Sequence, residues 1–197
     1  MKRMLPFIVA LMLAGCTSLS GSSQPVTHYV LTDPGPAIHL PNSHPGVLLL
    51  REMDAPAFYQ EPGLAYSREP GTRSHYEFAQ WAELPGKRLT WLLRQRLETA
   101  GVFAVVAPMG SGVVGDYQLN TRLIDFYHDA SVQPGSAFLL IEAELVRRSR
   151  GELMARQTFL AQVPVASYDA AGAASAMDSA ATKVIDEITV WLAKVTG

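Results

Sequence analysis

The sequence predicts an α+β fold in which an antiparallel sheet is covered on one face by two main helices. Three stretches of alternating polar and apolar residues follow one another at 116–128, 137–147 and 153–163. Segments with helical spacing of apolar residues lie before and after them, at 85–100 and 170–195. Strict alternation is typical of strands with one buried and one solvated face, and therefore of antiparallel sheets. Helices with one apolar face pack on such sheets, which gives the predicted two layers.

The chain begins with the three parts of a secretory signal. Lys2 and Arg3 supply positive charge, residues 5–13 form an apolar run, and small residues follow. This order is typical of an exported protein. The run is shorter than the about 20 apolar residues that cross a bilayer. Residues 1–15 are therefore predicted to be a signal peptide rather than a membrane span.

Leu13-Ala14-Gly15-Cys16 matches a lipobox, the motif in which a cysteine thiol is alkylated and becomes the mature N-terminus. Cys16 is the only cysteine of the chain, so it has no intramolecular disulfide partner. A lone thiol is a liability in an oxidising compartment, whereas a thioether is not. We therefore expect lipidation at Cys16 and attachment to a membrane through its acyl chains.

The segment 16–27 is predicted to be the lipidated cysteine followed by a flexible tether. Ser, Gly, Thr, Gln and Pro dominate it, with two isolated hydrophobic residues. Fully extended, it reaches roughly 35 Å. Residues 28–197 are then expected to form a single α+β domain, because a mature chain of about 180 residues favours one core.

The composition limits the classes of partner. The chain is 48% hydrophobic and 17% charged, as in foldable globular proteins. Its formal net charge is −2, and basic pairs are scattered after Arg3. Nucleic-acid binders carry a basic footprint, so no nucleic-acid partner is expected. Membrane attachment accordingly depends on the lipid and not on a polybasic patch.

Several shorter elements are predicted before the three long strands. Short strands are expected at 28–31, 47–50, 64–67 and 102–106. Proline-rich segments at 33–45 and 56–62 interrupt regular structure between them. The helix 85–100 is expected to end at Gly101, because glycine is the preferred residue after a helix.

The closing helix carries a broad apolar stripe. The stripe consists of Met177, Ala181, Val184, Ile188, Trp191 and Val195, widened by Ile185 and Leu192. A coiled-coil seam needs three or four heptads and a narrower stripe. We therefore expect the helix to lie on the sheet with Trp191 buried.

The sequence shows no catalytic or metal-binding pattern, so we expect neither an enzyme nor a cofactor. Ser111 lies between two glycines, outside any G-x-S-x-G motif, and is read as part of a turn. The histidines have no ligand spacing, and both a second cysteine and an H-E-x-x-H motif are absent, so a metal site is not expected. Gly-rich phosphate loops are absent too.

The acidic and the aromatic residues of the predicted strands are candidates for a function. Glu142 and Glu144 share one strand face and are read as its solvated side, and Asp125 and Asp129 as polar strand-end residues. Aromatic residues gather before the first helix and near the end of a later strand: Tyr66, Tyr76, Phe78 and Trp81, then Phe126 and Tyr127. Adjacent strand residues face opposite sides, so Phe126 and Tyr127 cannot both be buried on one side. Aromatic clusters serve either the core or protein contacts, and both readings stay open.

Several segments, taken in order, resemble the ABC-type transport auxiliary lipoproteins, the PqiC-like or YmbA-like family. They are the lipobox, His28 to Leu31, Ala55 to Tyr59, Tyr76 to Glu83, Asp116 to Leu119, Gly151 to Leu153, Phe159 and Trp191-Leu192. Gln80 and Leu84-Pro85 depart from the family pattern. These departures bear on which subfamily the chain resembles and not on the resemblance to the family. The resemblance implies a non-catalytic periplasmic subunit of a lipid-transport system that contains an ABC transporter and mammalian-cell-entry (MCE) domain proteins.

The residue after the lipobox cysteine indicates a location in the cell. Thr17 follows the lipobox cysteine, whereas an aspartate there is the usual signal for retention at the inner membrane. We therefore expect the protein to be anchored at the periplasmic face of the outer membrane.

Two rival hypotheses about function stay open. In these, the protein is either an accessory lipoprotein of an outer-membrane assembly or secretion machine, or a lipid-anchored hydrolase. Self-association into a homo-oligomer is a further expectation left open.

Overall fold

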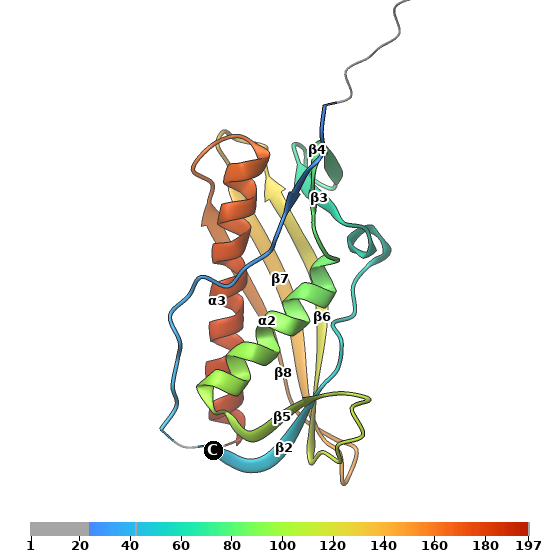
Figure 1. Cartoon of the computed structure of the whole chain (residues 1–197), viewed down its shortest axis with the longest axis vertical. Coiled ribbons are helices and arrows are strands. Elements are labelled where there is room, and N and C mark those ends of the chain that lie inside the picture. The colour runs from blue at the N-terminus through green and yellow to red at the C-terminus, as the bar shows by residue number, and fades with distance from the viewer. Residues whose placement is uncertain (1–23, 42, 197) are drawn as a thin grey trace, which may run out of the picture.

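The computed structural model describes residues 24–41 and 43–196. The lipobox and Cys16 lie outside the described residues. The described chain forms one sheet and two long helices (Figure 1). The strands are β1 Thr27–Tyr29, β2 His44–Leu50, β3 Gly63–Ser67, β4 Ser74–Trp81, β5 Phe103–Pro108, β6 Tyr117–Asp129, β7 Ser136–Arg147 and β8 Glu152–Pro164. The helices are α2 Pro85–Ala100 and α3 Ala170–Thr196, with a short 3-10 helix η1 at Ala57–Gln60.

The α+β class is confirmed, and the three long strands form the predicted antiparallel meander. β6 pairs with β7 and β7 with β8 in antiparallel register. The whole sheet is mixed, however, which corrects the expectation of a purely antiparallel sheet. β2 runs parallel to both β5 and β6, β3 runs parallel to β6, and β1 runs parallel to β4. Parallel pairs need long crossovers, and the alternation within one strand does not reveal such a distant partner.

The sheet divides on the side of β6 that faces away from β7. Near its start β6 pairs with β2, through Leu119 and Leu50, and at its end it pairs with β3, through His128 and Tyr66. Figure 1 shows β3 and β4 at one end of the molecule and β2 and β5 at the other. The segment from Arg51 to Pro62 passes between these two branches.

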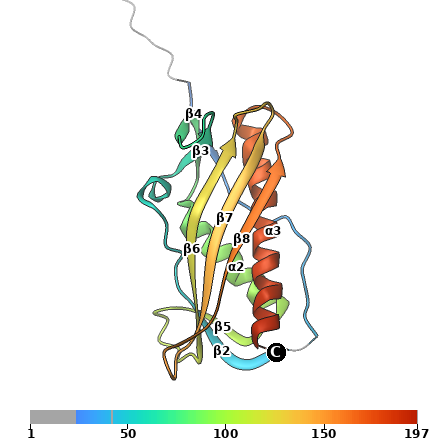
Figure 2. The ribbon, with the colours of Figure 1, turned by 180° about the vertical axis from the view of Figure 1, so that it is seen from behind.

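Both helices cover the same face of the sheet, as predicted, and Figure 2 shows the opposite face, which we call the outer face. α2 begins at Pro85 and ends before Gly101, whose φ of 68° is left-handed, so the predicted bounds are confirmed. α3 packs its apolar stripe on the sheet. The expected burial of Trp191 is confirmed, since it is 8% exposed and its ring lies 5.6 Å from that of Phe159.

A strap formed by residues 31–41 crosses over α3 before the chain enters β2 (Figure 1), and it contacts α2 as well. The backbone carbonyl of Leu31 accepts a hydrogen bond from Arg88 on α2. Thr32 donates from its backbone and its hydroxyl to Asp178 on α3. The strap therefore joins the two helices through side chains that the apolar pattern does not predict.

β6 contains a bulge between Leu123 and Asp125, which reverses its alternation. Leu123 is buried before the bulge, Ile124 is 37% exposed, and Phe126 is buried after it. Tyr127 thereby turns to the outer face, which confirms that it and Phe126 face opposite sides. Asp125 is not a strand-end residue as expected, because the strand continues to Asp129.

Two other features differ from what the sequence analysis predicted. The strand β4 was not predicted, although Tyr76 and Phe78 alternate with His75 and Glu77 within it. Thr27, assigned to the tether, already belongs to β1 and pairs with Ala79. The aromatic residues before the first helix are therefore part of the sheet.

Candidate functional site

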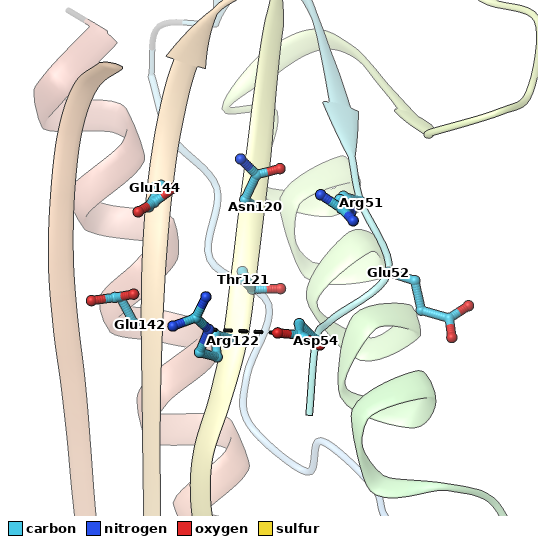
Figure 3. A pocket seen from close by; sticks show the side chains of 8 residues that line it. All are labelled: Arg51, Glu52, Asp54, Asn120, Thr121, Arg122, Glu142 and Glu144. Carbon is cyan, nitrogen blue, oxygen red and sulfur yellow. Dashed lines mark ion pairs between the residues drawn. The ribbon is translucent and has the colours of Figure 1, made fainter. Parts of the chain in front are cut away.

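A polar groove lies on the outer face where the sheet divides, with a volume of about 310 Å³ (Figure 3). β2 ends at Leu50, and the following segment returns to β6 only at the bridge between Asp54 and Arg122. The groove is lined by Arg51, Glu52, Asp54, Asn120, Thr121, Arg122, Glu142 and Glu144. The division of the sheet thus brings three separate segments of the sequence together, at 51–54, 120–122 and 142–144.

The groove carries charges of both signs. Arg122 lies between Glu142 and Asp54 in Figure 3, and its Nε is 3.5 Å from an oxygen of Asp54. Both members of this pair are largely exposed, so their attraction is weak. Glu144 pairs at 2.5 Å with Arg156 of β8. The groove therefore offers exposed charges that a charged partner can engage.

The solvated role predicted for Glu142 and Glu144 is consistent with their place on the outer face, where they line the groove. Thr121, in the groove floor, is 4% exposed, and its hydroxyl has no hydrogen-bond partner among the described residues. Arg51, Asp54 and Arg122 were not singled out from the sequence, because their proximity depends on the division of the sheet.

The other half of the outer face carries several apolar side chains. Tyr127 and Phe138 are cross-strand partners with ring centroids 5.3 Å apart. Leu140 pairs with Leu160, which is 52% exposed. Exposed apolar groups beside a charged groove are typical of protein interaction surfaces.

A second concavity, which we call the aromatic pocket, lies between β1, β3, β4 and the start of α3, with a volume of about 700 Å³. Its walls include Tyr29, Tyr66, Arg68, Tyr76, Phe78 and Asp169. The Tyr66 and Tyr76 rings are 4.9 Å apart, and the guanidinium carbon of Arg68 lies 5.1 Å from the centre of Tyr66. The volume falls within the range of small-molecule sites.

The structure thereby divides the aromatic residues whose role the sequence left open. Trp81 is 2% exposed and stacks on Phe126 at 5.7 Å, so these two belong to the core. Tyr66, Tyr76 and Phe78 line the pocket instead, and Phe78 is 40% exposed.

Partly buried hydrogen bonds hold the pocket wall in place. The Tyr76 hydroxyl lies 2.7 Å from Nδ1 of His128, and Nε2 of His128 lies 2.8 Å from the carbonyl of Pro134. Because a carbonyl only accepts, Nε2 carries the proton and Nδ1 accepts from Tyr76. Burial raises the pKa of Tyr76 to about 12.

Asp169, one of the two acidic residues of the pocket, is also fixed in position. Asp169 caps α3 by accepting a 2.7 Å hydrogen bond from the backbone N–H of Gly172. This bond, with a second from the Ser167 hydroxyl, lowers the pKa of the Asp169 carboxyl. Asp169 therefore presents a negative charge opposite the tyrosines.

Asp125 belongs to a clip between the strands and η1. It accepts a 2.6 Å hydrogen bond from the Tyr59 hydroxyl and pairs with Arg73 at 2.9 Å. The guanidinium of Arg73 also lies 3.6 Å from the centre of the Tyr127 ring. Burial, followed by the bond to Asp125, raises the pKa of Tyr59 to about 12. These contacts position η1 rather than form an open site.

The remaining candidate residues lie apart from one another. His28 pairs with Gln80, His44 contacts Tyr117, and Ser111 is exposed in its loop. In residues 24–41 and 43–196, no cluster of three or more His, Cys, Asp or Glu side chains is arranged to hold a metal ion. Neither long helix in this part of the chain has the length and apolarity of a membrane span. Cys16 is outside the described residues, so its lipidation stays a prediction.

Solved structures share this fold. A crystal structure of a DUF330-family protein from Xanthomonas campestris matches with a TM-score of 0.75 and 26% identity, over 86% of this chain and 96% of that chain. A protein described only as uncharacterised matches with a TM-score of 0.67 and 13% identity, over 85% of this chain and 99% of the other. A hypothetical protein from Chlamydia trachomatis gives a TM-score of 0.54 and 10% identity, over 77% and 98% of the two chains. The last two likenesses concern the fold alone.

No curated protein matches the sequence. The model of the family described as "ABC-type transport auxiliary lipoprotein component" matches residues 29–189, which run from the end of β1 into the last turns of α3. This match covers nearly all of the sheet and of the two helices, together with both concavities. The chain therefore belongs to the family of ABC-type transport auxiliary lipoprotein components.

Proposed function

We propose that this chain is a non-catalytic periplasmic lipoprotein that assists an intermembrane lipid-transport system built from MCE-domain proteins and an ABC transporter. The family match over residues 29–189 supports the proposal, because it assigns the chain to the auxiliary lipoprotein components of ABC-type transport. The MCE-domain partner is the finer part of the proposal and comes from the resemblance of the sequence segments named above. An auxiliary component acts by binding its partners, so its function depends on an available surface.

The outer face of the sheet is suited to this binding. No helix of the described chain covers it, and it combines the polar groove with the apolar residues Phe138, Leu140 and Leu160. An apolar centre beside charged groups is the usual composition of a specific protein interface. We therefore assign the contact with the MCE-domain partner to this face.

Copurification tests the assignment. The full lipoprotein, tagged at its C-terminus, is purified from detergent-solubilised membranes of its own bacterium, and the bound proteins are identified by mass spectrometry. We expect an MCE-domain protein together with the permease or ATPase of an ABC transporter. Recovery of a β-barrel protein without these partners would support an outer-membrane assembly role and contradict the proposal.

Surface variants then locate the contact. Leu160→Asp and Glu142→Lys alter the apolar and charged halves of the outer face, and Lys183→Glu alters the exposed side of α3 as a control. We expect the first two to reduce recovery of the MCE-domain protein at least tenfold, which corresponds to about 1.4 kcal/mol. Equal recovery with all three variants would exclude the outer face.

The lipid anchor on Cys16 and the outer-membrane location form part of the same proposal. Thr17 supports the location, because it stands where an aspartate would favour the inner membrane. Separation of membranes on a density gradient should place the wild-type protein in outer-membrane fractions. Recovery wholly in inner-membrane fractions would contradict this location.

A further inference from the structure

We propose that the aromatic pocket binds the headgroup and glycerol region of a zwitterionic, amine-bearing phospholipid in the membrane that holds the anchor. The inference rests on the proposed anchor at Cys16. It adds a lipid-binding site and an orientation, with the end of the molecule that carries β1 and β4 lying at the membrane surface.

The length of the tether limits where the membrane can be. Val26 is the tenth residue after Cys16 in the sequence. A flexible segment of this length has an average span of roughly 18 Å and reaches at most about 35 Å when extended. The point at which the tether joins the domain is therefore held close to the lipid surface.

The tether joins the domain beside the pocket. In the parallel register of β1 and β4, Thr27 lies opposite Ala79, so the preceding residues Val26 and Phe78 are neighbours. Both are large apolar residues with high exposure, 43% for Val26 and 40% for Phe78. Figure 1 shows the described chain entering at this end of the molecule, where α3 also begins. These two exposed apolar groups thus lie at the end that the proposed anchor would hold near lipid.

The chemistry of the pocket matches the proposed lipid. Aromatic rings such as those of Tyr29, Tyr66 and Phe78 favour the boundary between hydrocarbon and water. Arg68 supplies a guanidinium for the phosphate, a pairing favoured by its fork of donors.

Two acidic residues of the pocket supply the complementary charge. Asp169 and Glu77 line the same pocket and are exposed. A carboxylate pairs with an ammonium group and repels a phosphate, so these residues favour a headgroup that carries an amine over a purely anionic one. One cationic and two anionic side chains around aromatic walls therefore correspond to a phosphate followed by an amine.

Photo-crosslinking in native membranes tests the proposal. A photoreactive phenylalanine analogue replaces Phe78 in the full lipoprotein, and another copy carries it at Ile124 on the outer face. The two positions are matched in exposure, at 40% and 37%. We expect phospholipid adducts, mainly with phosphatidylethanolamine, at position 78 and none at position 124. Protein adducts or no adducts at position 78 would overturn the proposal, as would equal lipid adducts at both positions.

A second comparison tests the charged groups. Arg68→Ala removes the guanidinium from the pocket, whereas Arg150→Ala removes an exposed arginine from the β7–β8 turn as a control. Both variants keep the photoreactive residue at position 78 and are placed in vesicles of phosphatidylethanolamine and phosphatidylglycerol. We expect the Arg68 variant to give a severalfold lower yield of phosphatidylethanolamine adducts and the Arg150 variant to give an unchanged yield. Equal yields would exclude recognition of the phosphate by Arg68.

Labelling with palmitate separates the two proposals. A labelled protein in the membrane fraction that forms no lipid adduct at position 78 would contradict the pocket assignment alone. An unlabelled protein would contradict the anchor on which the pocket assignment rests.

Discussion

Arg96 of α2 donates hydrogen bonds of 2.6 Å and 3.0 Å to the carboxylate of Asp33 in the strap, 63 residues earlier in the chain. Their side chains are 5% and 10% exposed, so this ion pair lies in the protein interior. Asp186 of α3 contacts the same guanidinium at 2.6 Å. One buried cation therefore joins the strap to both helices.

Loss of Asp33 should destabilise the fold strongly. Asp33→Ala leaves the buried guanidinium with the partly exposed Asp186 as its one carboxylate partner and with the backbone carbonyl of Pro36. Removal of one partner from a buried ion pair costs about 3–5 kcal/mol. Unfolding in urea should show this as a lower midpoint with an unchanged slope. Glu98→Ala, which removes an exposed partner of Arg94, is the control and should change the free energy of unfolding by less than about 1 kcal/mol. Equal effects would contradict the role given to the strap.

Asp178 should make stability depend on pH. Burial raises the pKa of its carboxyl above the ordinary 3.8, although Thr32 donates to it. The folded state therefore holds this proton more tightly than the unfolded state, so its contribution to stability is present below pH 3.8 and is lost as pH rises through the folded pKa. Asp178→Asn cannot ionise and still accepts from the Thr32 backbone. Its stability relative to wild type should be greater at pH 7 than at pH 3, measured by thermal unfolding; the opposite order would show that the Thr32 bonds outweigh burial.

Trp191→Ala should remove a core contact. The indole packs on Phe159 and is 8% exposed, and changes from a large aromatic residue to alanine in a core cost about 3–5 kcal/mol. The neighbouring Val190 is 54% exposed, so Val190→Ala should change stability by no more than about 0.5 kcal/mol. A melting point unchanged by Trp191→Ala, together with lost partner binding, would identify α3 as an interface.

Tyr59 and Tyr76 should ionise late in an alkaline titration. The pKa values of Tyr59 and Tyr76 are each raised to about 12, whereas ordinary tyrosines ionise near pH 10. Between these values the unfolded state loses protons that the folded state keeps, so stability falls as pH rises. Phenolate absorbance should show a late step that becomes smaller in Tyr59→Phe and in Tyr76→Phe. A late step of unchanged size in both variants would refute the assignment.

Cys16→Ser should yield an exported protein that no longer associates with the membrane, because the proposed anchor is the lipid on this cysteine. Fractionation with labelled palmitate measures both the label and the location. A mutant protein that remains in the membrane pellet without label would show that a protein partner, and not the lipid, is the main anchor.

The sequence predicted elements whose determinants are local. Pro85, Gly101 and the leucines between them predicted α2 with its observed ends, and the alternation within β6, β7 and β8 predicted the meander. The bulge at Ile124 was not predictable, because each half of β6 alternates correctly and only the pairing with β7 reveals the extra residue. β4 went unrecognised because its aromatic residues were considered as a cluster rather than as alternating positions.

The candidate sites depended on distant residues and were predicted only in part. Tyr66, Tyr76 and Phe78 were recognised as unusual, but Arg68 and Asp169 join them only after β3 and α3 have packed. Arg51 and Arg122 likewise meet because the sheet divides beside β6. Charged residues on exposed surfaces have no periodic signal, so their grouping appears only in three dimensions.

β8 pairs with β7 along one side, and its other side faces no further strand among the described residues. An open edge of this kind is a template on which a strand from another molecule can add, and it favours aggregation when molecules are crowded. Arg156 near the middle of β8 and Pro164 at its end oppose such growth, since charge and the missing proline N–H both hinder an added strand. The proposed lipid anchor would concentrate these molecules on a membrane surface, and the open edge of β8 is where such crowding would favour aggregation.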